Sequence, residues 1–344
     1  MRRRTALLIA LAGVALLSSC DTARYLWQAA QGQLSLLRSA KPIADVLANS
    51  QTPAETHRKL ELARRVRDFA LTELGLPDHG SFRSFVDLKR PHVVWNVFSA
   101  PELSLDLRTK CFPVVGCVTY QGFFREVDAR AEEQKRRASG DDVMVGGVSA
   151  YSTLGYLKDP ILSSMFTSSD AWLVRTIIHE LSHPALYVAG DTMFSESYAT
   201  TIENEGMKRW LARYGTPELA AQDAQERGRN EQWQALSLNA RGQLAQLYAR
   251  NIPDAEKRQE KTKILDDLRT RATALRREWF GPDASPAPRQ NNASLGAVAT
   301  YADLVPAFEG LLARVNGDIP TFIQEARECA AKPKEARAAC LQGK

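Results

Sequence analysis

The sequence predicts an α+β fold that is mainly helical and carries a small antiparallel β-sheet. Apolar residues recur at helical spacing along most of the chain. Residues 91–124 instead hold runs of β-branched and aromatic residues broken by prolines and a glycine. With 344 residues the chain is long enough to bury a substantial core. We expect one domain over residues 20–344, preceded by a targeting segment.

The first nineteen residues have the layout of an export signal. Three arginines, Arg2 to Arg4, precede an apolar run from Ala6 to Leu17 that is too short to span a bilayer. The following Leu17-Ser18-Ser19-Cys20 resembles a bacterial lipobox, so Cys20 is expected to carry the lipid. An ordinary secretory signal is the alternative. We therefore expect a signal peptide over residues 1–19 and a membrane-anchored envelope protein.

Residues after the lipobox refine that expectation. Asp21 resembles the signal that keeps lipoproteins in the inner membrane of enteric-type bacteria, which favours an inner-membrane protein facing the periplasm. Four cysteines remain, an even number that suits an oxidising compartment. Of their three pairings, Cys111 with Cys117 and Cys329 with Cys340 are favoured, because local pairs need the least chain reorganisation. Buried free thiols are the alternative.

The charge pattern argues against one class of function. The formal net charge is +5, which is mild for this length. Lysines and arginines are spread along helical segments and do not alternate with aromatic residues. The sequence therefore gives no support for nucleic-acid binding.

Taken in order, the elements follow from local periodicity and breakers. Residues 22–90 read as helices, because apolar residues recur every three or four positions up to Gly75. Residues 91–160 hold the small sheet and a charged helix over 125–138. Residues 217–344 read as long polar helices, at 232–249 and 255–279, and as terminal helices at 318–330 and 334–341.

The run from Val143 to Tyr156 is the most distinctive part of the sheet region. It leads from apolar residues into the pair Gly146-Gly147 and small polar residues. Such a run suits an edge strand beside a ligand, because glycine permits close approach and an open edge offers free amide groups to a peptide. A tight turn is the alternative. Tyr151 in this run is a candidate for stabilising an oxyanion.

The chemistry lies in residues 170–214, where His179-Glu180-Leu181-Ser182-His183 occurs. On a helix from Ala171 to about Ala189, the two imidazoles lie one turn apart on one face and can reach a single ion. Glu180 lies at the edge of that face, where it can take a proton from water without becoming a ligand. The pattern predicts a zincin-like metallopeptidase that holds one Zn²⁺.

A third ligand follows from the turn after this helix. Gly190 is a natural helix stop and the next residues form a cap, so a second helix returns beside the first. Glu196 then lies about 9 Å up the second helix, level with His183 about 10 Å down the first. Glu203 is on the same face, about 10 Å further along. Glu196 is favoured as the ligand, and Glu203 as a carboxylate that contacts a ligand or the substrate.

These residues carry a family resemblance. Phe194 to Ala199, followed by Glu203, is similar to the Asn-Glu-Gly-Phe-Ala stretch of zinc aminopeptidases of the gluzincin group. With the histidine helix and residues 150–159, it resembles a bacterial family of predicted aminopeptidases that are frequently lipoproteins. Residues 94–99, 111–124 and 291–308 extend the resemblance over most of the mature chain. It implies an aminopeptidase that uses zinc to cleave peptides.

Three departures from the pattern stand out. Ser195 replaces the usual asparagine before the ligand glutamate, and Pro184 follows the second histidine. No Gly-x-Met-Glu-Asn segment, which binds the substrate amine in better-known relatives, is present. The aminopeptidase activity is therefore implied by the resemblance, whereas the metal chemistry is predicted by residues.

Two other functions remain open. One is a zinc endopeptidase of envelope quality control, and the other is a non-enzymatic envelope lipoprotein that keeps the zinc helix as scaffold. Glu180 argues against the scaffold, since a structural zinc site needs no base. Asn291, Asn292 and Tyr301 could line the cleft, and Tyr301 competes with Tyr151 for the oxyanion role.

Overall fold

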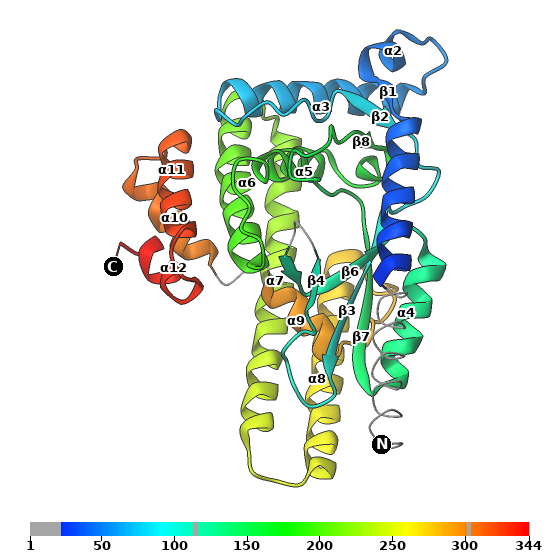
Figure 1. Cartoon of the computed structure of the whole chain (residues 1–344), viewed down its shortest axis with the longest axis vertical. Helices are drawn as coiled ribbons and strands as arrows, with labels where there is room; N and C mark the ends of the chain where they lie inside the picture. The colour runs from blue at the N-terminus through cyan, green and yellow to red at the C-terminus, as the bar shows by residue number, and fades with distance from the viewer. Residues whose placement is uncertain (1–21, 113–115, 301–303, 344) are drawn as a thin grey trace, which may run out of the picture.

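The protein is described here by a computed structural model that covers residues 22–112, 116–300 and 304–343 (Figure 1). The expected signal peptide, Cys20, Asp21 and Tyr301 lie outside these residues. Within them the fold is mainly helical with small, largely antiparallel sheets, so the α+β prediction is confirmed. None of the described helices is long and apolar enough to cross a membrane.

The N-terminal layer is mostly helical. It contains a helix over residues 22–39, β1 (Lys41–Pro42), α2 (Ile43–Ala48), α3 (Ala54–Thr72) and β2 (Ser84–Val86). The helix 22–39 runs down one side of the molecule and α3 lies across the top (Figure 1). β2 pairs antiparallel with β1 and parallel with β8 (Ile161–Leu162), which joins this layer to the segment before the histidine helix.

The central sheet has the order β6–β3–β7. Its strands are β3 (Val94–Pro101), β6 (Tyr120–Phe123) and β7 (Asp141–Val148), and both pairings are antiparallel. One cluster of buried side chains lies between the sheet and α4 (Glu126–Ala138), and another between the sheet and α9 (Asn292–Thr300). β7 covers most of the apolar part of the run predicted as an edge strand, and it is one edge of this sheet.

A short hairpin precedes β6. β4 (Lys110–Phe112) and β5 (Gly116–Val118) pair antiparallel, and a disulfide joins the directly opposed Cys111 and Cys117. Gly116 has a φ of 73°, and a Cβ there would lie 2.7 Å from the backbone nitrogen of Gly190. The hairpin is therefore packed against the turn between the two helices of the candidate site.

The main core surrounds α5 and α6. The remaining elements are η1 (Ser163–Phe166), α5 (Asp170–Ser182), α6 (Thr192–Tyr214), α7 (Pro217–Ala249), α8 (Asp254–Phe280), α10 (Val305–Arg314), α11 (Ile319–Ala330) and α12 (Lys334–Leu341).

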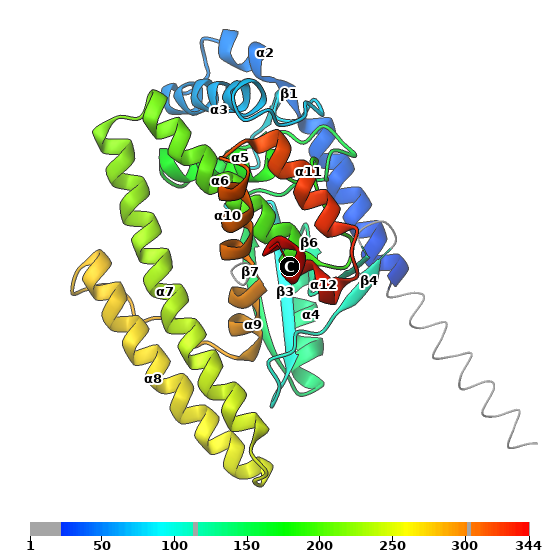
Figure 2. The ribbon, with the colours of Figure 1, turned by 90° about the vertical axis from the view of Figure 1, so that its left-hand side faces the viewer.

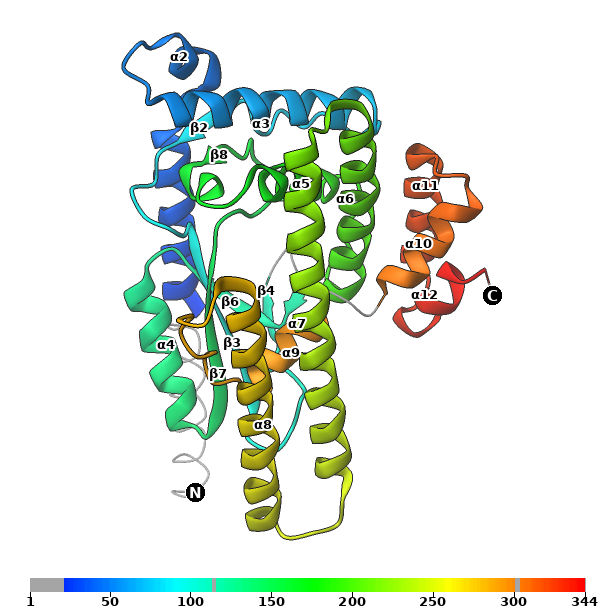
Figure 3. The same ribbon diagram turned by 180° about the vertical axis from the view of Figure 1, so that it is seen from behind.

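α7 and α8 form a long antiparallel hairpin that projects from the body, with its own buried cluster (Figures 2 and 3). The helix predicted over 232–249 is thus the second half of one helix that begins at Pro217.

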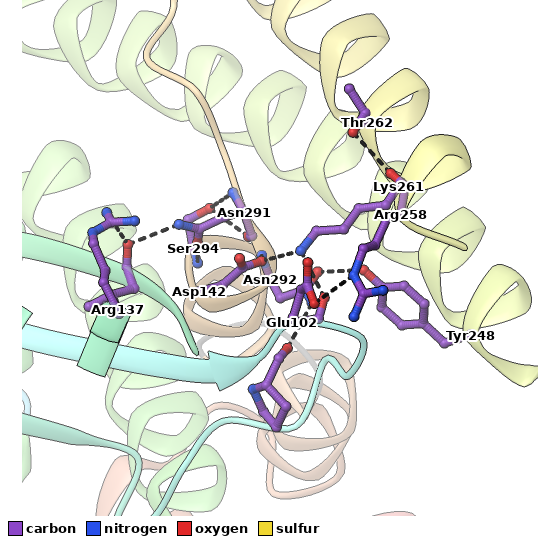
Figure 4. A network of polar contacts seen from close by, with 12 residues as sticks. Glu102, Arg137, Asp142, Tyr248, Arg258, Lys261, Thr262, Asn291, Asn292 and Ser294 are labelled. Atoms are coloured by element: carbon purple, nitrogen blue, oxygen red, sulfur yellow. Dashed lines mark hydrogen bonds and ion pairs between the residues drawn. The ribbon is translucent and has the colours of Figure 1, made fainter. Parts of the chain in front are cut away.

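A polar network ties this hairpin to the sheet (Figure 4). Lys261 of α8 donates to Asp142 of β7 over 2.7 Å and to the carbonyl of Glu102 over 2.8 Å. Asn292 donates through its backbone to Asp142 and through its side chain to the carbonyl of Glu102. Asn291 donates to the carbonyl of Val143. The two asparagines therefore fasten α9 to the sheet; this is the role that the structure shows for them.

A second disulfide, between Cys329 and Cys340, joins α11 to α12. We expect a Cys329→Ser/Cys340→Ser variant to lose about 3 kcal/mol in the free energy of unfolding, because the unfolded chain regains the entropy of a loop of this length. Urea unfolding of the variant measures this loss. Wild-type protein under reducing conditions, which also lacks the Cys111–Cys117 disulfide, should unfold at an equally low or lower urea concentration. Equal midpoints for variant and oxidised wild type would contradict the expectation.

Candidate metal centre

The helix α5 is fixed at its start by a cap and along its length by burial. The Ser169 side chain accepts a hydrogen bond from the amide of Trp172 over 3.0 Å. Its apolar face is buried in the core: Leu173, Val174, Ile177, Ile178 and Leu181. α5 ends at Ser182, although a helix to about Ala189 was predicted. Pro184 explains the difference, since proline has no amide hydrogen for the helix ladder.

The chain then reverses and returns as α6. Gly190 adopts a φ of 79°, which glycine reaches without strain. Asp191 caps α6 by accepting from the amide of Phe194, and Arg337 of α12 holds the other carboxylate oxygen of Asp191 at 2.6 Å. Ser195 stands where asparagine was expected, and its hydroxyl accepts from the amide of Val188. These contacts fix the turn that sets α6 against α5.

The turn brings three predicted ligands together. His179, His183 and Glu196 each offer one ligand atom, and these atoms lie within 4.8 Å of one another. Nε2 of His179 is 3.3 Å from Oε2 of Glu196, and Nε2 of His183 is 3.9 Å from the same oxygen. Two ligands of a tetrahedral ion with bonds near 2.1 Å stand about 3.4 Å apart. The three residues can therefore hold a metal ion.

The electrostatics of the three residues favour a cation between them. Burial lowers the pKa of His179, but hydrogen bonds with Glu196 and Glu203 outweigh it and hold that pKa well above its usual value. Burial would raise the pKa of Glu196, yet the two histidines lower it, so Glu196 is a carboxylate. Burial lowers the pKa of His183 to about 4, so this imidazole is neutral at pH 7, as a metal ligand must be.

Hydrogen-bonding capacity agrees with this arrangement. Nδ1 of His183 is buried and has no hydrogen-bond partner within the described part of the chain. No hydrogen bond of Nδ1 therefore orients the His183 ring, whose Nε2 is the nitrogen near Glu196. A neutral His183 could therefore bind an ion through Nε2, on the side where Glu196 lies.

Glu203 lies behind His179 and does not reach the ligand group. Its Oε2 is 3.0 Å from Nδ1 of His179, and because a carboxylate can only accept, Nδ1 carries a proton. Nε2 faces Glu196 and is the nitrogen that would bind an ion. Arg175 lies 3.1 Å from the other oxygen of Glu203 and is itself paired with Asp223 of α7 at 2.5 Å. A chain of ionic contacts thus runs from α7 to the ring of His179.

Glu180 is placed beside the group and outside it. It does not belong to the residues whose ligand atoms cluster. Burial raises the pKa of Glu180 to about 7; the charge of His179 opposes this, and Glu196 and Asp159 add to it. Asp159 has its own pKa raised to about 6 by burial, and it accepts two hydrogen bonds from Thr153. The loop 153–159 is therefore fixed next to the site.

Tyrosines surround the site, and two of them were missed from the sequence. The Tyr151 hydroxyl donates to Gln33, and the charge of Glu180 contributes to its raised pKa after burial and Asp159. Tyr120 and Tyr187 have pKa values raised first by burial and then by the charge of Glu196. They come from β6 and from the turn after α5. No local pattern marks them, because only the packing of the hairpin on that turn brings them close.

A groove reaches His179, one of the three ligand residues, from the side where Arg175 and Glu203 lie. Its volume is about 1610 Å³, and α5 contributes Trp172, Arg175 and His179 to its wall. α6, α7 and α10 contribute most of the remaining wall, much of it charged. The groove is wide enough for several residues of a peptide. It follows the face of α5 that carries the histidines.

Comparison with known protein families supports the assignment of the chain as a peptidase. Residues 24–341 match the model of the family described as "Putative aminopeptidase". No match was found among curated proteins or among solved structures. Because the family match spans nearly the whole chain, including every residue of the candidate site, the chain belongs to this aminopeptidase family.

Proposed function

We propose that the protein is a zincin-like zinc aminopeptidase of the bacterial cell envelope. The observation that carries the proposal is the pairing of a three-residue ligand group with one half-buried carboxylate, Glu180, beside it. Three protein ligands are typical of catalytic zinc, whereas structural zinc usually has four. The family match supports peptide hydrolysis in general.

Each residue has a distinct task in this proposal. His179, His183 and Glu196 would hold the ion, and Glu203 would fix the proton on Nδ1 of His179. A bound zinc ion supplies Lewis-acid chemistry, since it favours the loss of a proton from water and polarises a carbonyl. Glu180 accepts the proton of the attacking water and passes it to the leaving amine. Tyr120 joins Tyr151 and Tyr301 as a candidate for stabilising the oxyanion.

The location is proposed from the sequence, and the two disulfides agree with it. A lipid on Cys20 would anchor the chain, and Asp21 favours the inner membrane with the domain facing the periplasm. The two disulfides suit that compartment, because such bonds persist where thiols are oxidised. Labelling with a radioactive fatty acid, lost in Cys20→Ser, tests the anchor.

A zinc endopeptidase is the second candidate. The groove of about 1610 Å³ has room for several residues on one side of the site, as an endopeptidase requires. Aminoacyl-nitroanilides and internally quenched peptides separate the two functions. We expect purified protein to hold about one zinc ion per chain and to cleave the nitroanilides. Zinc-loaded protein that cleaves neither substrate would show that the proposed function is wrong.

The role of Glu203 can be tested by metal binding. We expect Glu203→Ala to weaken zinc affinity about 10- to 100-fold, because His179 loses the partner that sets its proton and its ring orientation. Competition with a chromophoric chelator measures the affinity. Glu205→Ala is the matched control, since it removes a carboxylate two residues away that pairs with Lys208 and Arg209. Equal affinities for both variants would contradict the role.

A further inference from the structure

The strand β6 presents an outer edge next to the candidate site. It is the outermost strand of its sheet, and it pairs with β3 so that Asn96 lies opposite Gly122 and Phe98 opposite Tyr120. In an antiparallel pair the backbone groups of alternate residues point away from the partner. The backbone N–H and C=O of Gly122 make hydrogen bonds outside the sheet. Tyr120, two residues earlier, therefore also points its N–H and C=O away from β3.

The helix 22–39 occupies part of that edge. Gln28 donates from Nε2 to the carbonyl of Gly122 over 3.2 Å, and its Oε1 accepts from the amide of Phe124, also over 3.2 Å. The Tyr25 hydroxyl accepts from the amide of Gly122. The carboxamide of Gln28 therefore makes the two hydrogen bonds that one residue of an added β-strand would make. A strand cannot pair with β6 there while the helix is in place.

The helix is also closely packed at this point. Gly32 lies so near Phe124 that a Cβ on it would be 2.1 Å from the ring. Gln33, one residue on, accepts from the Tyr151 hydroxyl, which joins the helix to the loop beside Glu180. The helix 22–39 therefore covers the β6 edge through close packing as well as through hydrogen bonds.

The covered edge begins close to the ligand group. The hairpin that leads into β6 packs against the turn between α5 and α6, where Gly116 meets Gly190, and the pKa of Tyr120 is raised by burial and then by the charges of Glu196 and Glu180. The covered positions start at Gly122. Two residues of a strand span about 7 Å. A peptide that pairs with β6 at Tyr120 can therefore extend only one or two residues in the direction of Gly122.

The groove lies elsewhere around the site. Its volume is about 1610 Å³, and it reaches His179 from the side of α6, α7 and α10. Figures 1 and 3 both place the helix 22–39 and α10 on opposite sides of the molecule, with α5 between them. The helix 22–39 therefore covers the β6 edge on one side of α5, and the groove that ends at His179 lies on the other.

We propose that Gln28 and the helix around it determine exopeptidase specificity, by closing the β6 edge so that only a peptide terminus fits beside the site. The inference rests on the proposed function and deepens it. Because the family is one of aminopeptidases, the terminus that meets the helix is the N-terminus, and the remainder of the peptide lies in the groove. Gln28 is a specificity residue that acts by occupying backbone groups of β6.

Substitution of one glutamine by glutamate tests the proposal. Gln28→Glu places a carboxylate oxygen against the Gly122 carbonyl, and two acceptors without a proton repel each other. Gln31→Glu is the matched control, because Gln31 is on the same helix and is exposed. Amide hydrogen exchange at Gly122 and Phe124, followed by NMR, reports whether the edge opens. Hydrolysis of an aminoacyl-nitroanilide and of an internally quenched octapeptide reports specificity.

We expect Gln28→Glu to exchange both amides at least tenfold faster and to raise the ratio of octapeptide to nitroanilide cleavage at least tenfold. Gln31→Glu should change neither. A ratio that stays within twofold of wild type in Gln28→Glu and in a Tyr25→Phe/Gln28→Ala variant would overturn the proposal, with nitroanilide cleavage still intact. Wild-type protein that cleaves neither substrate would instead overturn the proposed function, and this inference with it.

Discussion

Glu180→Gln is expected to lower kcat for peptide hydrolysis roughly 10²- to 10⁴-fold, the usual contribution of a general acid–base group. Glutamine keeps the size of the side chain but cannot accept the proton of the attacking water. Zinc content should stay at wild-type level, because Glu180 lies outside the ligand group. Steady-state rates on the best substrate, with metal analysis of the same samples, measure both quantities.

Two results would decide this prediction. Glu325→Gln makes the same chemical change on an exposed position of α11 and should leave kcat within twofold of wild type. If Glu180→Gln retained zinc and more than a tenth of the wild-type kcat, Glu180 would not be the general base. If it lost zinc, Glu180 would be a ligand, and the assignment of the site would have to change.

Glu196→Ala is expected to weaken zinc binding by several hundredfold. Zinc sites with four protein ligands bind with roughly 10–16 kcal/mol, so one ligand contributes on the order of 2.5–4 kcal/mol. The same variant should lose hydrolysis at limiting zinc and the thermal stabilisation that zinc gives the wild type. Chelator competition and thermal unfolding with and without zinc measure these effects.

Comparison with Glu203→Ala shows which of the two glutamates contributes more to zinc affinity. Glu196 is 3.3 Å from Nε2 of His179, whereas Glu203 contacts Nδ1 of the same ring. Loss of Glu196 should therefore weaken zinc binding more than loss of Glu203. The opposite order would exchange their roles.

The three ligand residues could be predicted from the sequence because local structure sets their relative positions. His179 and His183 are set by the helical repeat, and Glu196 by a turn that needs only Gly190 and a cap. The end of α5 was placed too far along, although Pro184 was visible. Helical periodicity continued through Leu186 and Val188, and the missing hydrogen bond of proline outweighed it.

The rest of the site depends on contacts between distant segments. Tyr120 is 60 residues before Glu180 in the sequence, and Gln28 is 94 residues before Gly122. No periodicity or capping rule links such positions, because their contact follows from how the sheet, the hairpin and the helix 22–39 pack. Apolar spacing predicted the helix but could not show that one of its glutamines would bond to a strand edge.

The helix α7 connects the α7–α8 hairpin to the candidate site. It is continuous over 33 residues, about 50 Å, and such a helix moves as a stiff rod. Near its start Asp223 holds Arg175, and its second half packs on α8 in a cluster separate from the main core. Displacement of the α7–α8 hairpin is therefore expected to move Asp223 and to disturb the ion pair between Asp223 and Arg175, the arginine that contacts Glu203.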